Sequence, residues 1–463
     1  MGSLNVGPES SAQRYVVLAL CGLVYAVTYL QRVMLAPITD AVQKHFGTDI
    51  AGVGTLSSCF FYTYSIAQPV VGLMVDATHA RWTMIASCLV IFAGSLVTGF
   101  VRSLAAGYVG RALVGLGCAP VYVTAIKYAS IYLSPERFVF CPGILAACAG
   151  LAGIIGSAPL KHLTDAIGFT WVCVGIGGTA FIPGILIACL GQYTSISAAE
   201  MGKASLQQFK AGLAEMFHNR GSLFLIPLML YYFFFSGGSY TISSCLGAAF
   251  IVNVNPEISS TYASWMFTLQ SVGLVIGGVA MPFISRYTGR KPPHLVASGL
   301  IALIMLAFAL IGEADPPGWA FGILYTFYGL FTACASSVGY SMCKELVSVA
   351  IASTVIGVFN FFPALGGAIF QNTLPLIIRH NPDGGYRIVG FIMTGQYALA
   401  MFIAIFLKET SPCTSTCIRS QKHRGQREVQ PPTPLTPEND NAQTSMLLDV
   451  RAETAITSPV CST

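Results

Sequence analysis

Charged residues are scarce in this sequence. They make up 9% of its 463 residues, whereas hydrophobic residues make up 54%. A soluble domain carries about 25% charged residues. A single soluble core of this length cannot bury so much apolar surface, so we predict that the surrounding solvent is a lipid bilayer. The basic residues are sparse and lie mainly in short loops, which excludes a nucleic-acid-binding surface.

Motifs for catalysis and for cofactor binding are also missing. The sequence contains no HExxH, no Walker A loop and no Cys/His cluster with metal-ligand spacing. Most of the 14 cysteines stand singly inside apolar stretches, for example Cys21, Cys59 and Cys88, as small packing residues do. We therefore expect no enzyme activity, no metal, no cofactor and no ATP-driven step on this chain.

Twelve long apolar stretches predict transmembrane helices, each of which needs about 20 apolar residues. They lie at 15–37, 51–75, 82–101, 105–132, 138–160, 170–191, 222–252, 260–284, 294–313, 318–343, 347–378 and 386–407. The predicted fold class is an all-α polytopic membrane protein. Its predicted parts are an N-tail (1–14), a six-helix bundle (15–191), a polar central loop (192–221), a second six-helix bundle (222–407) and a disordered tail (408–463).

The distribution of Lys and Arg predicts the orientation, because cytoplasmic loops carry the excess of positive charge. The loops on the side of the two tails hold Arg81, Arg137, Lys203, Lys210, Arg220, Arg286, Arg290, Lys291 and Lys344. The other side holds Lys44, Arg102, Lys161, Arg379 and Arg387. Both termini are therefore predicted to be cytoplasmic. Leu447-Leu448 resembles a dileucine sorting signal without its acid, which leaves the plasma membrane and an endolysosomal membrane open.

Two short loops on the tail side occupy equivalent places in the two halves. Their sequences are Gly72-Leu-Met-Val-Asp76-Ala-Thr-His-Ala-Arg81 and Ser285-Arg286-Tyr-Thr-Gly289-Arg290-Lys291. A carboxylate such as Asp76 can accept hydrogen bonds from a helix N-terminus or pair with a cation. We predict a conformational latch built from Gly72, Asp76, Arg81, Arg286, Gly289 and Arg290. The alternative is that Asp76 is a solvated loop acid and that the arginines only set the topology.

These loops resemble the signature Gly-x-x-x-Asp-Arg-x-Gly-Arg-Arg/Lys of the major facilitator superfamily. The first copy has Ala77 and His79 where Arg and Gly are usual, and the second copy has no acid. Gly110-Arg111-Ala-Leu-Val-Gly115-Leu-Gly117 is similar to the family's Arg-x-x-x-Gly-x-Gly element. The resemblance covers residues 15–407. It implies two six-helix bundles with inverted repeats and transport by alternating access.

Carboxylates are missing from the interiors of the apolar stretches, but two arginines are present there. Arg32 and Arg111 each lie inside a predicted span, where an ionisable residue is costly and points to function. Spacings of four and three place Tyr25, Tyr29 and Arg32 on one helical face, where they can line a cavity. The alternative is that Arg32 snorkels to the outer surface near Pro37.

Arg111 either binds substrate or holds span four against span one. The resemblance implies that spans one, four, seven and ten line the cavity, which favours Tyr122, Tyr231 and Tyr325. Gln270 and Asn360 are further candidates, although hydrogen bonds between helices explain these two amides equally well. The predicted substrate site is therefore Tyr25, Tyr29, Arg32, Arg111, Tyr122, Tyr231, Gln270, Tyr325 and Asn360.

The predicted function is secondary-active or facilitative transport of a small organic solute, anionic or carboxylate-bearing, by alternating access. The expected partners are the solute, the lipid bilayer and a possible coupling ion, either a proton or sodium. The missing intramembrane acids argue against a carboxylate proton relay. The alternative function is a non-transporting membrane sensor or scaffold that kept the transporter fold, which the degenerate loop motifs motivate.

Overall fold

The computed structural model describes residues 11–138, 141–190, 223–311, 317–347 and 352–410, together with residues 207, 210 and 214. The chain divides into two units, Met1–Cys413 and Thr414–Thr463. All of the second unit lies outside the described residues, and so does most of the predicted N-tail and central loop. The predicted disorder of 408–463 therefore stays a prediction.

Every regular element in the described ranges is a helix. The first half contains α1 (Ser11–Val33), α2 (Thr39–Phe46), α3 (Ile50–Ala77), α4 (Ala80–Phe100), α5 (Leu104–Cys118), α6 (Val121–Tyr132), α7 (Pro135–Phe138), α8 (Cys141–Ile155), α9 (Ala158–Ile167) and α10 (Phe169–Leu190). The second half contains α12 (Leu225–Thr241), η2 (Ile242–Leu246), α13 (Gly247–Val254), α14 (Ser260–Thr288), α15 (Lys291–Leu310), α16 (Gly318–Cys334), η4 (Ala335–Gly339), α17 (Tyr340–Glu345), α18 (Ala352–His380) and α19 (Gly385–Ala404).

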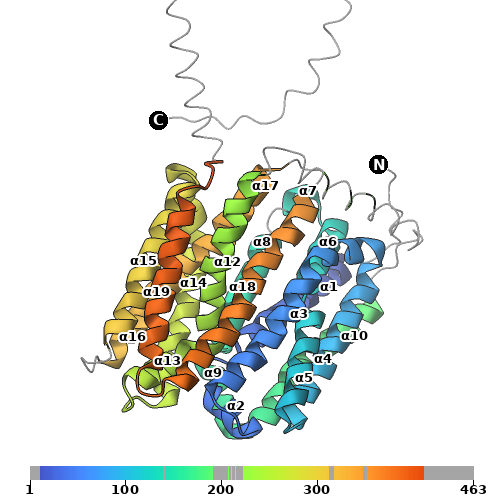
Figure 1. The fold of residues 1–463 in the computed structure, drawn as a ribbon. Coiled ribbons are helices and arrows are strands. Elements are labelled where there is room, and N and C mark those ends of the chain that lie inside the picture. The colour runs from blue at the N-terminus through green and yellow to red at the C-terminus, as the bar shows by residue number, and fades with distance from the viewer. Residues whose placement is uncertain are drawn as a thin grey trace, which may run out of the picture. The chain divides into compact units, whose positions relative to one another are not determined.

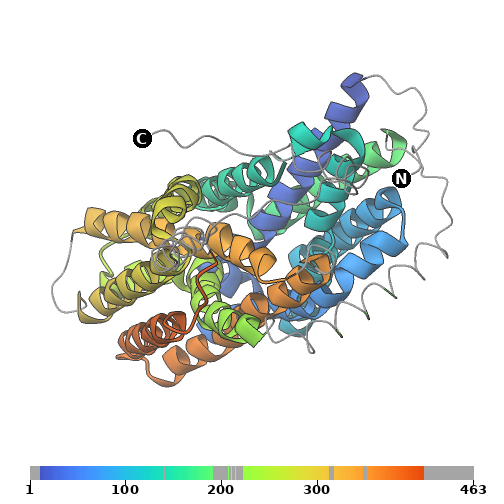
Figure 2. The ribbon, with the colours of Figure 1, turned by 90° about the horizontal axis from the view of Figure 1, so that it is seen from above.

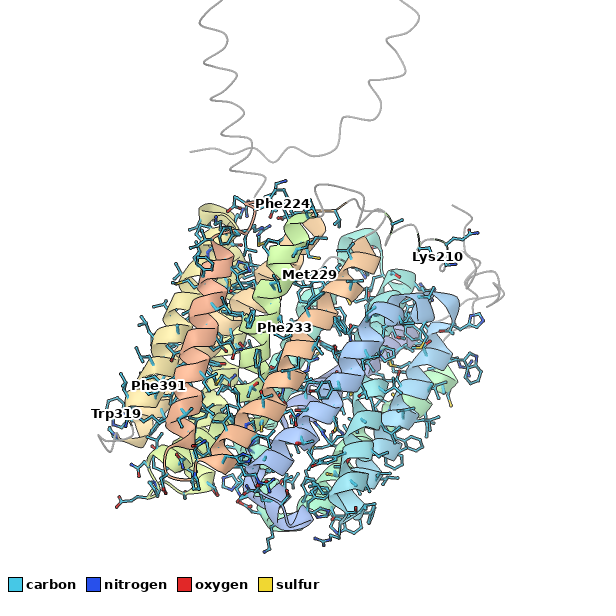
Figure 3. All side chains as sticks on the ribbon, viewed as in Figure 1. Lys210, Phe224, Met229, Phe233, Trp319 and Phe391 are labelled. Atoms are coloured by element: carbon cyan, nitrogen blue, oxygen red, sulfur yellow. The ribbon has the colours of Figure 1, made fainter. Side chains whose placement is uncertain are left out.

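The prediction of an all-α multi-pass protein is confirmed. Eleven helices or continuous helix runs of the described chain are long and apolar enough to cross a membrane. The bent pair α8 and α9, with 50° between its helices, makes a twelfth span if it is counted as one. Large apolar side chains such as Trp319 and Phe391 are exposed on the outside of the helices, where lipid would cover them (Figure 3).

Local sequence explains where several helices begin and break. Asp49 accepts a hydrogen bond from the N–H of Gly52 at 3.0 Å and so caps α3. Ser259 caps α14 in the same way through the N–H of Tyr262 at 3.2 Å. Pro120 separates α5 from α6, because proline has no N–H for the helical ladder. The π-helical segments η2 and η4 interrupt the seventh and tenth spans, and such turns often mark functional positions.

The helices have two ends, which we name by their elements. At the Ser11 end α1 begins and α19 ends; the α2 end, at the bottom of Figure 1, holds α2, α9 and α13. In the view along the helices, the blue helices of the first half lie on the right and the yellow and red helices of the second half on the left (Figure 2). The halves meet where α3 packs against α18 and where α8 and α9 pack against α14.

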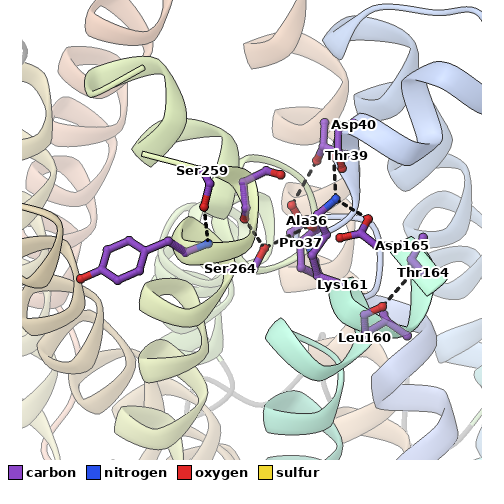
Figure 4. Close-up of polar contacts among 12 residues, drawn as sticks. Ala36, Pro37, Thr39, Asp40, Leu160, Lys161, Thr164, Asp165, Ser259 and Ser264 are labelled. Atoms are coloured by element: carbon purple, nitrogen blue, oxygen red, sulfur yellow. Dashed lines mark hydrogen bonds and ion pairs between the residues drawn. The ribbon is translucent and has the colours of Figure 1, made fainter. Parts of the chain in front are cut away.

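Polar contacts join the two halves at the α2 end. Ser264 donates a hydrogen bond to the carbonyl of Pro37 at 3.2 Å (Figure 4). The N–H of Ala158 donates to Thr268 at 3.1 Å, and Arg379 pairs with Asp49 at 3.1 Å. Further hydrogen bonds between α3 and α18 extend inward as far as Gln68 and Asn360. The two halves therefore close on each other at the α2 end.

Candidate functional site

Arg32 is surrounded by aromatic rings that come from three helices. Its guanidinium carbon lies 5.1 Å from the ring centre of Tyr64 and 5.3 Å from that of Tyr240. The rings of Tyr29 and Phe61 follow at 5.8 and 6.0 Å. Each ring presents a negative face to a cation within this range. Because Tyr240 belongs to the second half, the site of Arg32 lies between the two halves.

Arg32 has no counter-ion among the described residues. The ion pairs found in this part of the chain involve Lys161, Arg290 and Arg379. The buried Nε atom of Arg32 has no hydrogen-bond partner, although the side chain as a whole is only half-buried. The rings therefore attract the cation but do not neutralise it.

Arg32 lies at the level of the middle of neighbouring helices. Phe61 and Tyr64 stand well inside α3, and Tyr240 stands in the middle of the span Leu225–Val254. A side chain that snorkelled to the membrane surface would instead contact residues at helix ends. These contacts favour an Arg32 that lies between the two halves, away from the membrane surface.

Tyrosines and amides continue from Arg32 toward the Ser11 end. The rings of Tyr25 and Tyr122 lie 5.2 Å apart and connect α1 to α6. Gln68 is about one helical turn from Tyr64 toward the Ser11 end, and its Oε1 accepts from the side-chain amide of Asn360 at 3.4 Å. The hydroxyl of Tyr340 donates to the side-chain oxygen of Asn360. All these side chains except Gln68 are half-buried, and they come from both halves.

Arg111 has a different environment from Arg32. It is 1% exposed, and its Nη2 donates to the carbonyl of Gln31 at 2.9 Å. The side chain of Gln31 in turn donates to Ser95 at 2.8 Å. The guanidinium also lies 5.1 Å from the ring centre of Phe60. These contacts tie α5 to α1, α3 and α4 within the first half.

Three predicted site residues lie inside the second half. Tyr231 is fully buried, and its hydroxyl lies 3.0 Å from that of Ser298 on α15. Tyr325 is fully buried and donates to the carbonyl of Gly247 at 2.6 Å. Gln270 is 6% exposed and its Oε1 has no partner. The structure does not bring these side chains to Arg32.

Residues outside the predicted site complete the surroundings of Arg32. Phe61, Tyr64 and Gln68 follow one another at spacings of three and four, which place them on one face of α3. The same periodic pattern that predicted the face of α1 could have found them. No sequence pattern distinguishes Tyr240, which reaches Arg32, from Tyr231, which does not.

The second predicted latch loop finds its acids elsewhere in the chain. Arg290 pairs with Glu345 at the end of α17 at 2.9 Å and donates to Ser285 at 2.9 Å. The carboxylate of Glu409 accepts from the main-chain N–H groups of Arg290 and Lys291 at 2.7 and 3.0 Å. An anion at a helix N-terminus satisfies unpaired N–H groups and interacts favourably with the helix dipole.

Gly289 is required at this loop. Its φ of +93° is unfavourable for other residues, and a Cβ there would lie 2.6 Å from Glu409. Arg286, the other predicted latch residue of this loop, is exposed.

The first predicted latch loop is described only in part. The side chain of Asp76 lies outside the described residues, so its pairing stays a prediction. Arg81 stacks over Trp82 at 5.5 Å, and Gly72 has open space where a Cβ would stand. The ammonium of Lys127 donates to the carbonyls of Val75 and Thr78, and so supplies donors to the C-terminal end of α3.

The chemistry of the site is that of binding. In the part of the chain that the structure describes, no three His, Cys, Asp or Glu side chains gather to hold a metal. Among the described residues, the interface between the halves offers Arg32 without a counter-ion, phenol hydroxyls and amides. This set can hold and orient a polar or anionic solute between two halves that close at one end.

Comparison with known proteins identifies the family. The sequence model of the Major Facilitator Superfamily matches residues 21–371. A putative tartrate transporter of Agrobacterium vitis is 24% identical over 87% of this chain and 95% of its own length. A D-galactonate transporter of Escherichia coli O6:H1 is 21% identical over 80% of this chain and 90% of its own. The crystal structure of a D-xylose-proton symporter superposes with a TM-score of 0.67 at 13% identity, covering 86% of this chain and 98% of that one.

The fold and the site thus define a membrane transporter of small organic solutes and not an enzyme. The chain belongs to the major facilitator superfamily, as the loop motifs and the Arg111 element indicated.

Proposed function

We propose that this transporter carries a small organic anion, and that Arg32 binds the negative charge of the solute. The observation that carries the proposal is the unpaired guanidinium of Arg32 between the two halves, with aromatic rings from α1, α3 and α12 around it. Because no carboxylate of the described residues pairs with this cation, it is available to a carboxylate of a solute that arrives from solution.

The chemistry of arginine suits a carboxylate. A guanidinium can donate two parallel hydrogen bonds to a carboxylate, and such charge-assisted bonds are about twice as strong as neutral ones. The names of the matched tartrate and D-galactonate transporters support this solute class, because both named solutes bear carboxylates.

The remaining side chains have orienting roles in this proposal. Tyr25, Tyr29 and Tyr240 offer hydroxyls near Arg32. Tyr122 packs against Tyr25, and Asn360 offers an amide toward the Ser11 end. Arg111 is proposed to position α1, and through it Arg32, because it donates to the main chain of the neighbouring Gln31. We leave Tyr231, Gln270 and Tyr325 out of the proposed site, because they are buried inside the second half.

The transport cycle would alternate between closure at the α2 end, which the structure has, and closure at the Ser11 end. The excess of Lys and Arg supports a cytoplasmic Ser11 end, in the plasma membrane or an endolysosomal membrane. The Arg290–Glu345 pair and its neighbours are proposed to hold the helix ends of the second half during this movement. A proton or sodium ion is the proposed coupling ion if the cycle is coupled.

Uptake by the purified protein in proteoliposomes tests the proposal. The probes are radiolabelled D-galactonate and tartrate, with an inside-positive potential to draw the anion in. We expect saturable uptake that Arg32→Gln lowers about 10- to 100-fold, because a hydrogen bond to a charged group contributes about 1.5–3 kcal/mol. Arg102→Gln, which changes an exposed arginine, is the matched control and should keep the wild-type rate.

Two results would count against the proposal. Unchanged uptake by Arg32→Gln would remove Arg32 from anion binding. Binding of these anions in a thermal-shift assay without any flux would instead support the sensor or scaffold function.

A further inference from the structure

We infer that this transporter is an anion exchanger: its binding site switches back to the other side of the membrane efficiently only when an anion occupies Arg32. This inference rests on the proposed function and concerns the return step of the cycle. Its starting point is that Arg32 has no counter-ion among the described residues.

The position of Arg32 makes its charge matter during the conformational change. The rings around it come from both halves, since Tyr64 belongs to α3 and Tyr240 to the span that follows the central loop. In alternating access the halves rock around such a site, so that the site is closed from both ends in the intermediate state. Water around Arg32 is then at its lowest.

The loaded and the empty carrier differ in this closed state. With a carboxylate on Arg32, the halves close around a neutral pair. Without it, they close around an unpaired cation, which the bilayer interior disfavours strongly. Ring faces attract a guanidinium but leave its charge in place. The empty carrier should therefore change conformation slowly, whereas a carrier that holds an anion should change conformation quickly in both directions.

Other cations of the structure keep their surroundings within one half. Arg111 has no carboxylate partner among the described residues either, but its contacts with Gln31 and Phe60 lie inside the first half.

Lys161, which is 3% exposed at the α2 end, has Asp40 and Asp165 at 2.6 and 2.7 Å (Figure 4). Arg290 has Glu345 at 2.9 Å. These cations carry their counter-ions with them within one half, and so their environment need not change as the halves move.

The test compares exchange with net uptake in proteoliposomes of the full chain. Vesicles contain unlabelled D-galactonate, potassium chloride or only potassium HEPES, and each takes up radiolabelled D-galactonate. Valinomycin with equal potassium on both sides holds the potential at zero. We expect vesicles with internal D-galactonate to take up label at least about tenfold faster than vesicles with HEPES, since the unpaired charge opposes the empty return step. Acceleration by internal chloride would identify a small inorganic anion as a sufficient counter-anion and also supports the exchange.

A designed counter-ion sharpens the test. Tyr64 lies nearest to Arg32 and belongs to the same half, so a carboxylate there would accompany Arg32 through the whole cycle. Tyr64→Glu should lower the ratio of exchange to net uptake toward one, whereas the neutral Tyr64→Gln should keep it high. Size-exclusion profiles and thermal unfolding report whether both variants fold. If either variant does not fold, the ratio of exchange to net uptake of the wild-type protein still tests the exchange.

Failure has two distinguishable forms. Equal uptake into D-galactonate-filled and HEPES-filled vesicles overturns the exchange and leaves the proposed function standing. Absence of labelled flux into all vesicles, repeated with tartrate as the probe, overturns the proposed function, and the exchange falls with it.

Discussion

Arg111 donates a hydrogen bond to the main-chain carbonyl of Gln31 at 2.9 Å, and Gln31 immediately precedes Arg32 in α1. The two intramembrane arginines are therefore neighbours in structure but differ in what satisfies them. Neither has a counter-ion among the described residues. Arg111 is fully buried and bonded to Gln31 within the first half, whereas Arg32 is half-buried and ringed by aromatic side chains from both halves.

The first prediction concerns stability. Arg111→Gln should lower the free energy of unfolding by about 1–3 kcal/mol, because it leaves the buried partners of Arg111 unsatisfied. Arg32→Gln should leave stability unchanged or raise it, because it removes an unpaired charge from the space between the halves. Thermal unfolding of both purified variants in the same detergent checks this. Equal losses of stability in the two variants would contradict the different roles given to the two arginines.

The second prediction concerns the charged cluster at the Ser11 end of the second half. Glu409→Ala should lower the free energy of unfolding by about 1 kcal/mol, the usual contribution of a helix cap, because two N–H groups at the start of α15 lose their acceptor. Glu345→Ala should cost less than about 1 kcal/mol, because its pair with Arg290 is partly exposed. Chemical unfolding of the two variants measures the difference.

Gly289→Ala provides an independent check on this cluster. The added Cβ would meet Glu409 at 2.6 Å in a backbone conformation with φ of +93°. We expect a loss at least as large as that of Glu409→Ala. A neutral effect would show that Glu409 does not occupy the start of α15.

The third prediction concerns closure at the α2 end. Gly54 lets α3 approach α18 closely, since a Cβ there would lie 2.3 Å from the carbonyl oxygen of Gln371. Gly54→Ala should weaken this contact and raise hydrogen–deuterium exchange at the α2 ends of both helices. Gly278→Ala on α14, where a Cβ meets open space, is the control. Unchanged protection in Gly54→Ala would contradict close packing between the halves here.

The fourth prediction concerns pH. His45 in α2 lies outside the membrane spans, and burial among Phe46 and Phe169 lowers its pKa below the usual value of about 6.5. As pH falls below about 6.5, the unfolded chain takes up this proton before the folded one does, and stability is lost. The midpoint temperature of thermal unfolding should therefore be lower at pH 5 than at pH 7.5.

His45→Gln should reduce the acid sensitivity, because its amide can still donate to the carbonyl of Val101 without gaining charge. His380→Gln, at an exposed position, should leave the acid sensitivity unchanged. If the two variants respond to acid alike, His45 is not the group responsible.

The face of α1 illustrates what periodicity can predict. Tyr25, Tyr29 and Arg32 share a face by spacing alone, and the structure places Arg32 beside Tyr29 and near the second half. In the second half the tyrosines and amides were equally plausible by type. Tyr231 and Tyr325 point into their own bundle, whereas Tyr240 reaches Arg32. The rotation of a helix about its axis depends on its neighbours. The sequence of an apolar span does not indicate which face turns toward the other helices and which toward lipid.

The charged cluster illustrates contacts that no local pattern can show. The second loop motif has no acid of its own, yet Glu345 at the end of α17 and Glu409 in the segment after α19 reach it. These residues are 55 and 119 positions away from Arg290 in the chain. A motif read along the chain cannot include them.

The sequence by itself determined the membrane environment, the helical spans and the superfamily, because these follow from apolar length, charge distribution and short motifs. Tertiary structure alone decided which arginine is enclosed within the first half and which lies between the two halves. That distinction depends on partners from other helices: Gln31 and Phe60 for Arg111, and rings from α3 and α12 for Arg32. The partners of a charged side chain come from helices packed against it, and the order of residues along the chain does not show which helices pack together.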